Sequence, residues 1–382
     1  MATVSTKQDP SVFGARLGRA RRAAAQAGSD ALLITPGSDL RYLIGVGGES
    51  HERLTCLVLP AEPEAEPALV VPKLEEPGLA GVPLAELGVH VVTWVDGQDP
   101  HALVTELLAR GGARPARIAV ADGMPALHAI PLRDALPGAE QVLAGPILRE
   151  LRMRKDTAEI ESLRAAGAAI DRVHARMAEF LAVGRTEAQV GADITEAILA
   201  EGHVEAAFVI VGSGPNGASP HHDVSDRVIE RGDVVVVDIG GPMADGYNSD
   251  CTRTYVLGEP APEVRDTYAV LQQAQRDAVQ AVRPGVTAES VDAAARGPIG
   301  HAGFGAQFVH RTGHGIGLDV HEEPYVVGGN PAVLEPGMVF SVEPGIYQEG
   351  AWGARIEDIV VVTDTGVETL NNRPHELAVL PV

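Results

Sequence analysis

The chain has 382 residues, of which 45% are hydrophobic, so it is long enough for two domains with sizeable cores. Its 52 acidic and 30 basic residues give a net charge of −22, which opposes binding to nucleic acid and to anionic membranes. It shows no long apolar run, no readable targeting segment and only two cysteines without a disulfide pattern, which together predict a cytoplasmic protein.

The first part of the chain alternates helix-like and strand-like stretches. An Arg- and Ala-rich stretch at residues 13–28 predicts a helix. Val- and Leu-rich stretches predict strands at residues 30–37, 54–60, 67–72, 89–95 and 116–123. This alternation indicates an α/β domain with its own core. The charged segment at residues 148–167 predicts one helix that enters a second domain, so we place the domains at residues 1–150 and 151–382.

The second domain carries four carboxylates and a glycine-flanked histidine in short motifs, most of them in or beside runs of Val and Ile that predict buried strands. These residues are Asp238, Asp250, His314, Glu343 and Glu357. A carboxylate in an apolar strand must be paired, protonated or bound to a metal. A single such acid is more often a salt-bridged core residue, whereas four of them with an imidazole favour a cation.

The same pattern occurs twice in this domain. Residues 230–240 and 335–345 share a turn glycine followed by an acid, and a second acid follows a turn-rich segment at residues 242–248 or 347–353. Each half therefore predicts a hairpin with one carboxylate on each arm. A helix start precedes each hairpin, with Thr186 and Thr287 as the predicted N-caps. Two similar halves that face each other would place the paired acids around a shared centre.

Paired carboxylates of this kind can bridge two divalent ions about 3.5 to 4 Å apart, with a hydroxide between them as nucleophile. An oxygen-rich site suits Mn²⁺ and also accepts Co²⁺, Zn²⁺ or Fe²⁺. Cys56 and Cys251 have no CxxC spacing, which argues against a structural zinc site. We therefore predict a site for two divalent ions whose ligands are Asp238, Asp250, His314, Glu343 and Glu357.

Histidines near the predicted centre could handle protons and substrate. His221 follows a glycine- and proline-rich turn, and His321 lies in a glycine-rich run that also holds His310. We expect His221 and His321 to stabilise a tetrahedral intermediate and to shuttle protons. His222 could equally be a surface residue without a catalytic duty.

These motifs resemble the pita-bread metallopeptidases, which include Xaa-Pro aminopeptidase, prolidase and methionine aminopeptidase, together with the metal-free creatinases. The resemblance rests on VVVVDIGG, NSDCTRT, HRTGHGIGLDVHEEP, FSVEPGIY and ARIEDIVVV, which surround the five predicted ligands. It implies an α/β fold, with a creatinase-like N-terminal domain before a pita-bread domain that has an internal pseudo-two-fold repeat. Since no ligand is missing, it implies an active metalloenzyme. It also implies that His310 and Arg355 contact the substrate and that the protein is a homodimer.

The N-terminal domain and one substitution bear on the substrate. Methionine aminopeptidases lack such a domain, and several prolidases have an Arg after the HExP-type segment that can hold a dipeptide's carboxylate, where this chain has Tyr325. We therefore expect an aminopeptidase that removes the residue before proline from longer peptides, with Glu343 accepting the proton of the metal-bridging water. The alternatives are a prolidase acting on Xaa-Pro dipeptides, a creatinase-like hydrolase of a small amide and, least favoured, a non-catalytic peptide-binding module.

Overall fold

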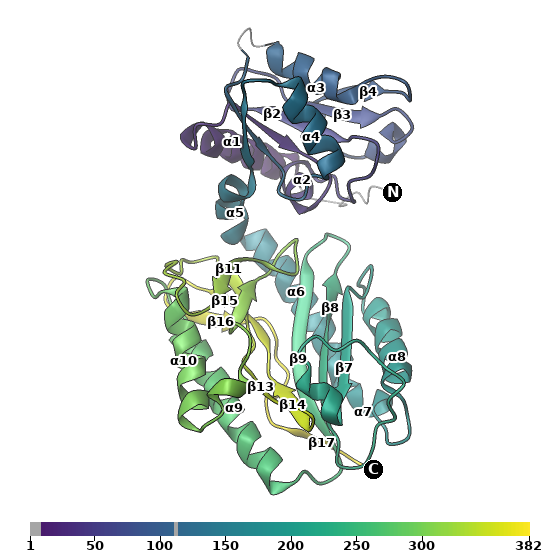
Figure 1. The fold of residues 1–382 in the computed structure, drawn as a ribbon, viewed down its shortest axis with the longest axis vertical. Coiled ribbons are helices and arrows are strands. Elements are labelled where there is room, and N and C mark those ends of the chain that lie inside the picture. The colour runs from purple at the N-terminus through teal and green to yellow at the C-terminus, as the bar shows by residue number, and fades with distance from the viewer. Residues whose placement is uncertain (1–8, 111–113) are drawn as a thin grey trace. The chain divides into compact units, whose positions relative to one another are not determined.

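The structure is a computed structural model that describes residues 9–110 and 114–382, and the chain divides after Arg152 into two compact units (Figure 1). Within the described residues, none of the helices combines the length and the apolar character needed to span a membrane.

The first unit is a mixed six-stranded sheet with helices around it. The strand order is β4-β3-β2-β1-β5-β6, in which β1 runs antiparallel to β2 and parallel to β5. The strands are β1 (Ala31–Ile34), β2 (Cys56–Pro60), β3 (Ala68–Pro72), β4 (His90–Trp94), β5 (Arg117–Val120) and β6 (Glu140–Leu143). The helices are α1 (Pro10–Gln26), α2 (Ser38–Ile44), η1 (Glu76–Leu79), α3 (Pro100–Ala109) and α4 (Ala126–Ala135), followed by α5 (Gly145–Met153). The predicted helix, strands and α/β character of this part are confirmed.

The single helix that we predicted at residues 148–167 is wrong, because the segment forms two helices. α5 ends at Met153, and α6 (Thr157–Ala175) begins after the N-cap Asp156. Asp156 accepts a hydrogen bond from the Glu159 amide at 2.9 Å, and the Glu159 side chain accepts one from the Asp156 amide at 3.0 Å. This reciprocal capping box satisfies two amides that a continuous helix would engage internally, so it favours a new helix start at this place.

The second unit contains two main sheets and a short hairpin. One sheet has the order β17-β9-β8-β7, a second has the order β11-β10-β12-β15-β16, and β13 pairs with β14. The strands of the first sheet are β7 (Phe208–Ser213), β8 (Val234–Pro242), β9 (Asn248–Leu257) and β17 (Ala378–Leu380). The other strands are β10 (Gly313–Gly315), β11 (Glu322–Val326), β12 (Val339–Val342), β13 (Gly345–Gln348), β14 (Trp352–Arg355), β15 (Asp358–Val362) and β16 (Val367–Thr369).

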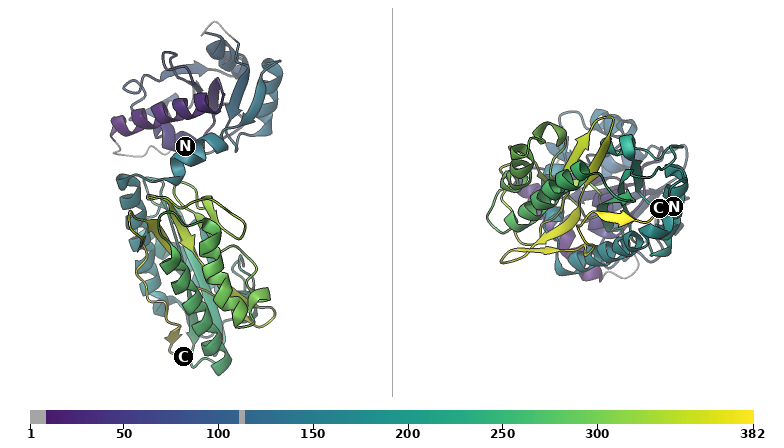
Figure 2. Two further views of the ribbon diagram at one scale, coloured as in Figure 1. Left: turned by 90° about the vertical axis from the view of Figure 1, so that its left-hand side faces the viewer. Right: turned by 90° about the horizontal axis from the view of Figure 1, so that it is seen from below.

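Two groups of helices cover these sheets and bury two apolar cores. α6, α7 (Met177–Phe180) and α8 (Glu187–Ala200) pack on the β7–β9 sheet, where Ile194, Val237 and Leu257 are fully buried. α9 (Pro262–Ala281) and α10 (Ala288–His301) run side by side and share a core with Phe340 and Val360 of the second sheet (Figures 1 and 2). Burial of this apolar surface removes it from water and stabilises both halves. Short 3₁₀ turns, η2 (Gly214–Ala218) and η3 (Gly305–Gln307), lie in the connections.

The predicted repeat recurs in the backbone. Thr186 and Thr287 both occupy N-cap positions, and each forms an isolated antiparallel bridge, to Val228 and to Val333 respectively. Only Thr186 forms a side-chain capping bond, in which its hydroxyl accepts from the Gln189 amide at 3.2 Å. The two halves therefore share a helix start and a strand contact, while the detail of the cap differs.

The first predicted hairpin is confirmed, and the second has a different form. β8 and β9 pair without interruption, and Asp238 and Asp250 lie on opposite arms. In the second half, β13 pairs with β14 near the turn, but β12 pairs with β15 in another sheet. Glu343 and Glu357 lie in the two gaps between these pairings. Pro344 after Glu343 has no N–H for a ladder, so it marks the point where the strand leaves the sheet.

Candidate active site

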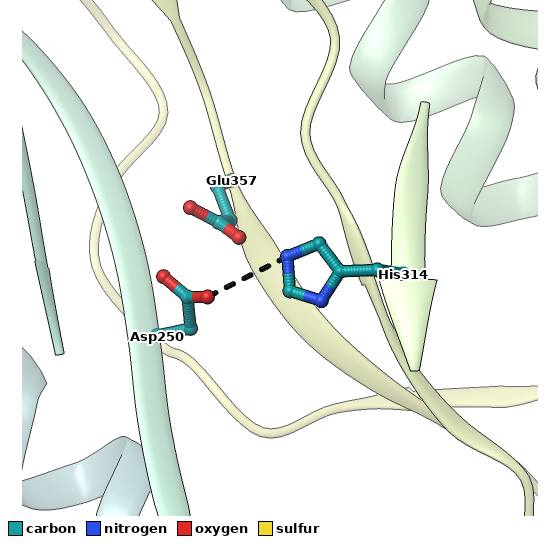
Figure 3. A group of neighbouring side chains, drawn as sticks. All are labelled: Asp250, His314 and Glu357. Atoms are coloured by element: carbon teal, nitrogen blue, oxygen red, sulfur yellow. Dashed lines mark ion pairs between the residues drawn. The ribbon is translucent and has the colours of Figure 1, made fainter. Parts of the chain in front are cut away.

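The five predicted metal ligands come together at one pocket although they lie on different elements. Asp238 and Asp250 lie on β8 and β9, His314 lies on β10, and Glu343 and Glu357 lie in the breaks of the second hairpin. All five line the same pocket of about 620 Å³. Single ligand atoms of Asp250, His314 and Glu357 lie within 4.8 Å of one another, and their side chains point toward a common point (Figure 3).

The imidazole of His314 faces the carboxylates with a lone pair. Its Nδ1 lies 3.1 Å from the Gly315 carbonyl, which can only accept, so the proton belongs on Nδ1. Nε2 then has no proton, yet it lies 3.2 Å from Glu343 Oε1 and 3.7 Å from Asp250 Oδ2. Lone pairs that face one another at this range need a proton or a cation between them.

Two carboxylate oxygens in the site are buried without a partner. Within the described part of the chain, Asp238 Oδ1 and Glu357 Oε1 form no hydrogen bond. The other oxygen of Glu357 accepts from Thr252 Oγ1 at 2.7 Å, which fixes the direction of the carboxylate. Buried polar atoms nearly always have a partner, and an unpaired one is costly. Four carboxylates and one imidazole with such oxygens fit a divalent cation of the hard or borderline class.

The carboxylates of the site lie close enough together to shift one another's pKa values. Burial and the charges of Glu357, Asp238 and Glu343 raise the pKa of Asp250 well above its usual range. Burial and the charges of Glu343 and Asp238 do the same for Glu357. Burial also opposes the ionisation of Glu343, but when a second proton on His314 Nε2 makes the imidazole a charged donor, its hydrogen bond and charge outweigh burial and lower the pKa of Glu343 to about 2. The cluster therefore resists carrying four negative charges unless a cation balances them.

Neighbouring hydroxyls orient the ligands. Ser341 Oγ accepts from the His314 amide at 2.9 Å and donates to Glu343 Oε1 at 3.0 Å. The backbone here is close-packed, since a Cβ on Gly313 would lie 1.8 Å from the Ser341 carbonyl oxygen. Only glycine fits at residue 313, and the tight approach of the two strands fixes the position of His314.

Arg355 lies beneath the pocket with all of its donors in use. Its Nη2 donates to Asp238 Oδ2 at 2.6 Å, Nη1 to the Tyr347 hydroxyl at 2.7 Å and Nε to Thr252 Oγ1 at 3.0 Å, while Nη1 and Nη2 each also reach the Pro220 carbonyl at 3.3 Å. A guanidinium has five N–H groups, so none is left for a substrate in this arrangement. The side chain is 2% exposed. Its contact with a substrate stays a prediction.

Tyr347 extends this network to His310. The Tyr347 hydroxyl is 2.8 Å from His310 Nε2, and His310 Nδ1 is 2.7 Å from the Arg311 carbonyl. Because that carbonyl accepts, Nδ1 carries the proton and Nε2 accepts from the hydroxyl. Burial raises the pKa of Tyr347 to about 12 and lowers the pKa of His310, so both groups are neutral near pH 7.

The remaining histidines lie at the more open side of the pocket. His221 and His321 are exposed and line the pocket. The His321 ring meets the His314 ring edge to face, with centroids 4.2 Å apart. The ring is partly shielded from water by the pocket wall, and this desolvation and the neighbouring charges of His314 and Arg311 lower the pKa of His321 to about 4, so it is neutral near pH 7. His222 also lines the pocket, and its Nε2 lies 2.8 Å from Glu187 Oε2.

Glu187, which was not among the residues predicted for the site, anchors the segment that carries His221 and His222. This carboxylate is fully buried and accepts from the hydroxyls of Ser213 and Ser225, both at 2.6 Å, and from the Asn216 amide at 3.1 Å. Burial opposes its ionisation, but these hydrogen bonds outweigh it and lower its pKa. In the sequence it is an acid in the first turn of a helix, a common position that gave no signal of this role.

Two family models match the chain, one in each of its two parts. Metallopeptidase family M24 matches residues 161–364, and the creatinase/prolidase N-terminal domain matches residues 16–154. The chain is 61% identical to a probable dipeptidase PepE of Mycobacterium tuberculosis over 99% of both chains. It is 34% identical to an Xaa-Pro dipeptidase of Lactobacillus helveticus over 93% of this chain and 96% of the other. The crystal structure of dipeptidase PepE from Mycobacterium ulcerans matches with a TM-score of 0.93 and 60% identity, covering 98% of this chain and all of that one.

Proposed function

The chain belongs to metallopeptidase family M24, and from this premise we propose that it is a metal-dependent dipeptidase that hydrolyses Xaa-Pro dipeptides. Membership confirms the family resemblance, the expectation of an enzyme and the fold class, a pita-bread domain after a creatinase-like N-terminal domain. The substrate is supported by relatives whose names specify a dipeptidase or the Xaa-Pro bond. They favour the prolidase alternative over the aminopeptidase that we expected from Tyr325.

The observation that carries the proposal is the cluster of carboxylates with two unpartnered buried oxygens at a pocket. We propose that two divalent ions are held there by Asp238, Asp250, His314, Glu343 and Glu357. Mn²⁺ fits these ligands best, and Co²⁺, Zn²⁺ or Fe²⁺ are accepted alternatives. When bound, the ions would supply a Lewis acid for the scissile carbonyl and would lower the pKa of the attacking water. A creatinase-like or purely binding protein has no need of such a complete set.

The side chains around the cluster divide the remaining work. Glu343, which lies 3.2 Å from His314 Nε2 and beside the other carboxylates, is the carboxylate that we propose accepts the proton of the attacking water. His321 is neutral there, so its N–H can donate to the oxyanion of the tetrahedral intermediate. His221, at the open side, can pass a proton to the leaving proline nitrogen. Protonation of that nitrogen is needed because proline leaves poorly as a nitrogen anion.

The pocket wall offers places for the two residues of a dipeptide. Phe208, Val209 and Ile210 provide an apolar side that suits a proline ring. We propose that His310 contacts the substrate, while Arg355 acts through Asp238 and the Tyr347 hydroxyl, both of which it holds in place. The homodimer and the cytoplasmic location stay predictions.

The proposal is tested with a length series given to metal-stripped protein with and without Mn²⁺. The series is alanyl-proline, a tripeptide that begins with alanyl-proline and a longer peptide with the same start, and alanyl-alanine is the control for proline. We expect metal-dependent cleavage of alanyl-proline at the highest rate. Faster cleavage of the longer peptides would establish an aminopeptidase instead, and no cleavage of any peptide would favour a small amide as substrate. The Glu357→Gln variant serves as the control for contaminating peptidase.

A further inference from the structure

Two arginines line the pocket, and only one of them has an anionic partner. Arg355 is paired with Asp238 and uses its five N–H groups within the protein. The Arg311 guanidinium forms neither an ion pair nor a hydrogen bond with any residue that the structure describes. A cation in a pocket with unused in-plane donors is poised for an anion that arrives with the substrate.

We infer that Arg311 binds the C-terminal carboxylate of the dipeptide and thereby selects dipeptides over longer peptides. The inference rests on the proposed function and deepens it by naming the residue that distinguishes a dipeptide from a longer peptide. A dipeptide presents a carboxylate one residue beyond the bond to be cut, whereas a longer peptide presents a neutral carbonyl at the same place. Only the carboxylate can form a charge-assisted, two-pronged pair with a guanidinium.

The side chain of Arg311 is held in a fixed direction by an aromatic ring. Its guanidinium carbon lies 4.4 Å from the centre of the Tyr325 ring. Stacking on a ring occupies one face of the guanidinium and leaves the N–H groups at its edge free. A carboxylate therefore meets donors that are already oriented, which reduces the entropy lost on binding.

The backbone on both sides of Arg311 is also fixed. The carbonyl of His310 accepts from Arg296 Nη2 at 2.8 Å, and the carbonyl of Arg311 lies 2.7 Å from His310 Nδ1. Thr312 is fully buried, and its hydroxyl donates to Asp292 Oδ1 at 2.7 Å. The side chain of Arg311 thus projects from a rigid segment.

The place of Arg311 in the pocket suits this role. It lines the pocket together with the carboxylate cluster, and its charge contributes to the lowered pKa of His321, so the two side chains are near each other. His321 in turn contacts His314 of the cluster. The guanidinium therefore lies in the same pocket as the carboxylate cluster without belonging to the cluster.

This arrangement also explains why the presence of Tyr325 does not by itself indicate an aminopeptidase. An uncharged residue at that position offers no charge-assisted contact to a dipeptide's carboxylate, although a basic residue from elsewhere could supply one. In the structure, the ring of Tyr325 supports a guanidinium that comes from another segment. The positive charge is thus provided by Arg311, and Tyr325 orients it.

The experiment compares alanyl-proline with alanyl-prolinamide, which has the same length but no carboxylate. For the wild-type enzyme we expect kcat/KM to be about 10- to 100-fold higher for the acid than for the amide, the range of a hydrogen bond to a charged group. Arg311→Gln should bring this ratio close to one, and Arg311→Lys should retain part of it. Tyr325→Phe keeps the ring face and should keep the ratio. Arg276→Ala is the matched control, since Arg276 is an exposed arginine that does not line the pocket.

A wild-type ratio near one, an unchanged ratio in Arg311→Gln, or an equal fall for both substrates would overturn the inference. Calorimetric binding of the same two compounds separates it from the proposed function. If the wild-type enzyme cleaves neither compound, the proposed function fails. Tighter binding of the acid that is lost in Arg311→Gln would still support the role of Arg311, and equal binding of acid and amide would refute it.

Discussion

We predict that replacing His174 by glutamine removes part of the protein's loss of stability in acid. His174 lies on α6 and is 1% exposed. Its Nε2 is 3.0 Å from the Cys251 carbonyl on β9, and its Nδ1 is 2.9 Å from the Tyr255 hydroxyl. It therefore ties the helix to the strand that carries Asp250. Burial and the charge of Arg253 lower its pKa from 6.5 to about 3.

The size of the effect follows from the difference in proton binding. Between pH 6.5 and pH 3 the unfolded chain binds a proton at His174 that the folded protein does not bind. Each pH unit in this range therefore lowers the free energy of unfolding by about 1.4 kcal/mol. From pH 8.0 to pH 5.0 the loss is about 2 kcal/mol, and well above pH 6.5 the slope contributed by the group falls to zero.

The assay is urea unfolding of the wild-type protein and of His174→Gln at intervals between pH 5.0 and pH 8.0. Glutamine also loses hydrogen bonds, so the variant is less stable at neutral pH, and the informative quantity is the slope of the free energy of unfolding against pH. We expect the two curves to run parallel above pH 7 and to converge by about 2 kcal/mol at pH 5.0. Parallel curves over the whole range would refute the reasoning, because His174 would then titrate equally in both states.

Two further predictions concern the pocket, and a third concerns the packing of β14 against η2. Asp250→Asn should lower hydrolysis by more than about 100-fold, while thermal unfolding in a chelator shows no loss of stability, since burial and neighbouring charges already oppose ionisation of this group. His321→Ala should reduce kcat by about 100-fold with unchanged metal content by atomic absorption, and equal losses of both would show a structural role. Gly353→Ala places a Cβ 1.9 Å from the Gly217 carbonyl oxygen and should cost about 1 to 3 kcal/mol of stability, whereas Gly366→Ala, with open space around it, should cost little.

Patterns local in the sequence predicted much of the fold. The strands of the first unit and the β8–β9 hairpin follow from runs of Val and Leu between turn residues. The second hairpin could not be predicted in full, because Glu343 and Glu357 lie where the chain changes from one sheet to another. Such a change depends on which strands are neighbours in space, and the local sequence pattern does not determine which strands become neighbours.

The candidate site shows the same division. The carboxylates and His314 could be found because an acid in an apolar run is costly to bury unless it is paired or bound to a metal. Glu187 and Tyr347 could not, because each looks ordinary in its own segment and gains its role from side chains on other elements. Arg311 and Tyr325 come into contact only in the folded protein. The positive charge that we assign to carboxylate binding therefore comes from Arg311, although the residue at position 325 is uncharged.

The raised pKa values of Asp250 and Glu357 have a consequence for handling the protein. A proton and a metal ion compete for the same carboxylate oxygens, so loading the site displaces protons into the buffer. Metal affinity must then weaken as the solution becomes more acidic, over a range in which most surface carboxylates are already ionised. Specific activities measured at different pH values would therefore be comparable only between samples with the same metal content.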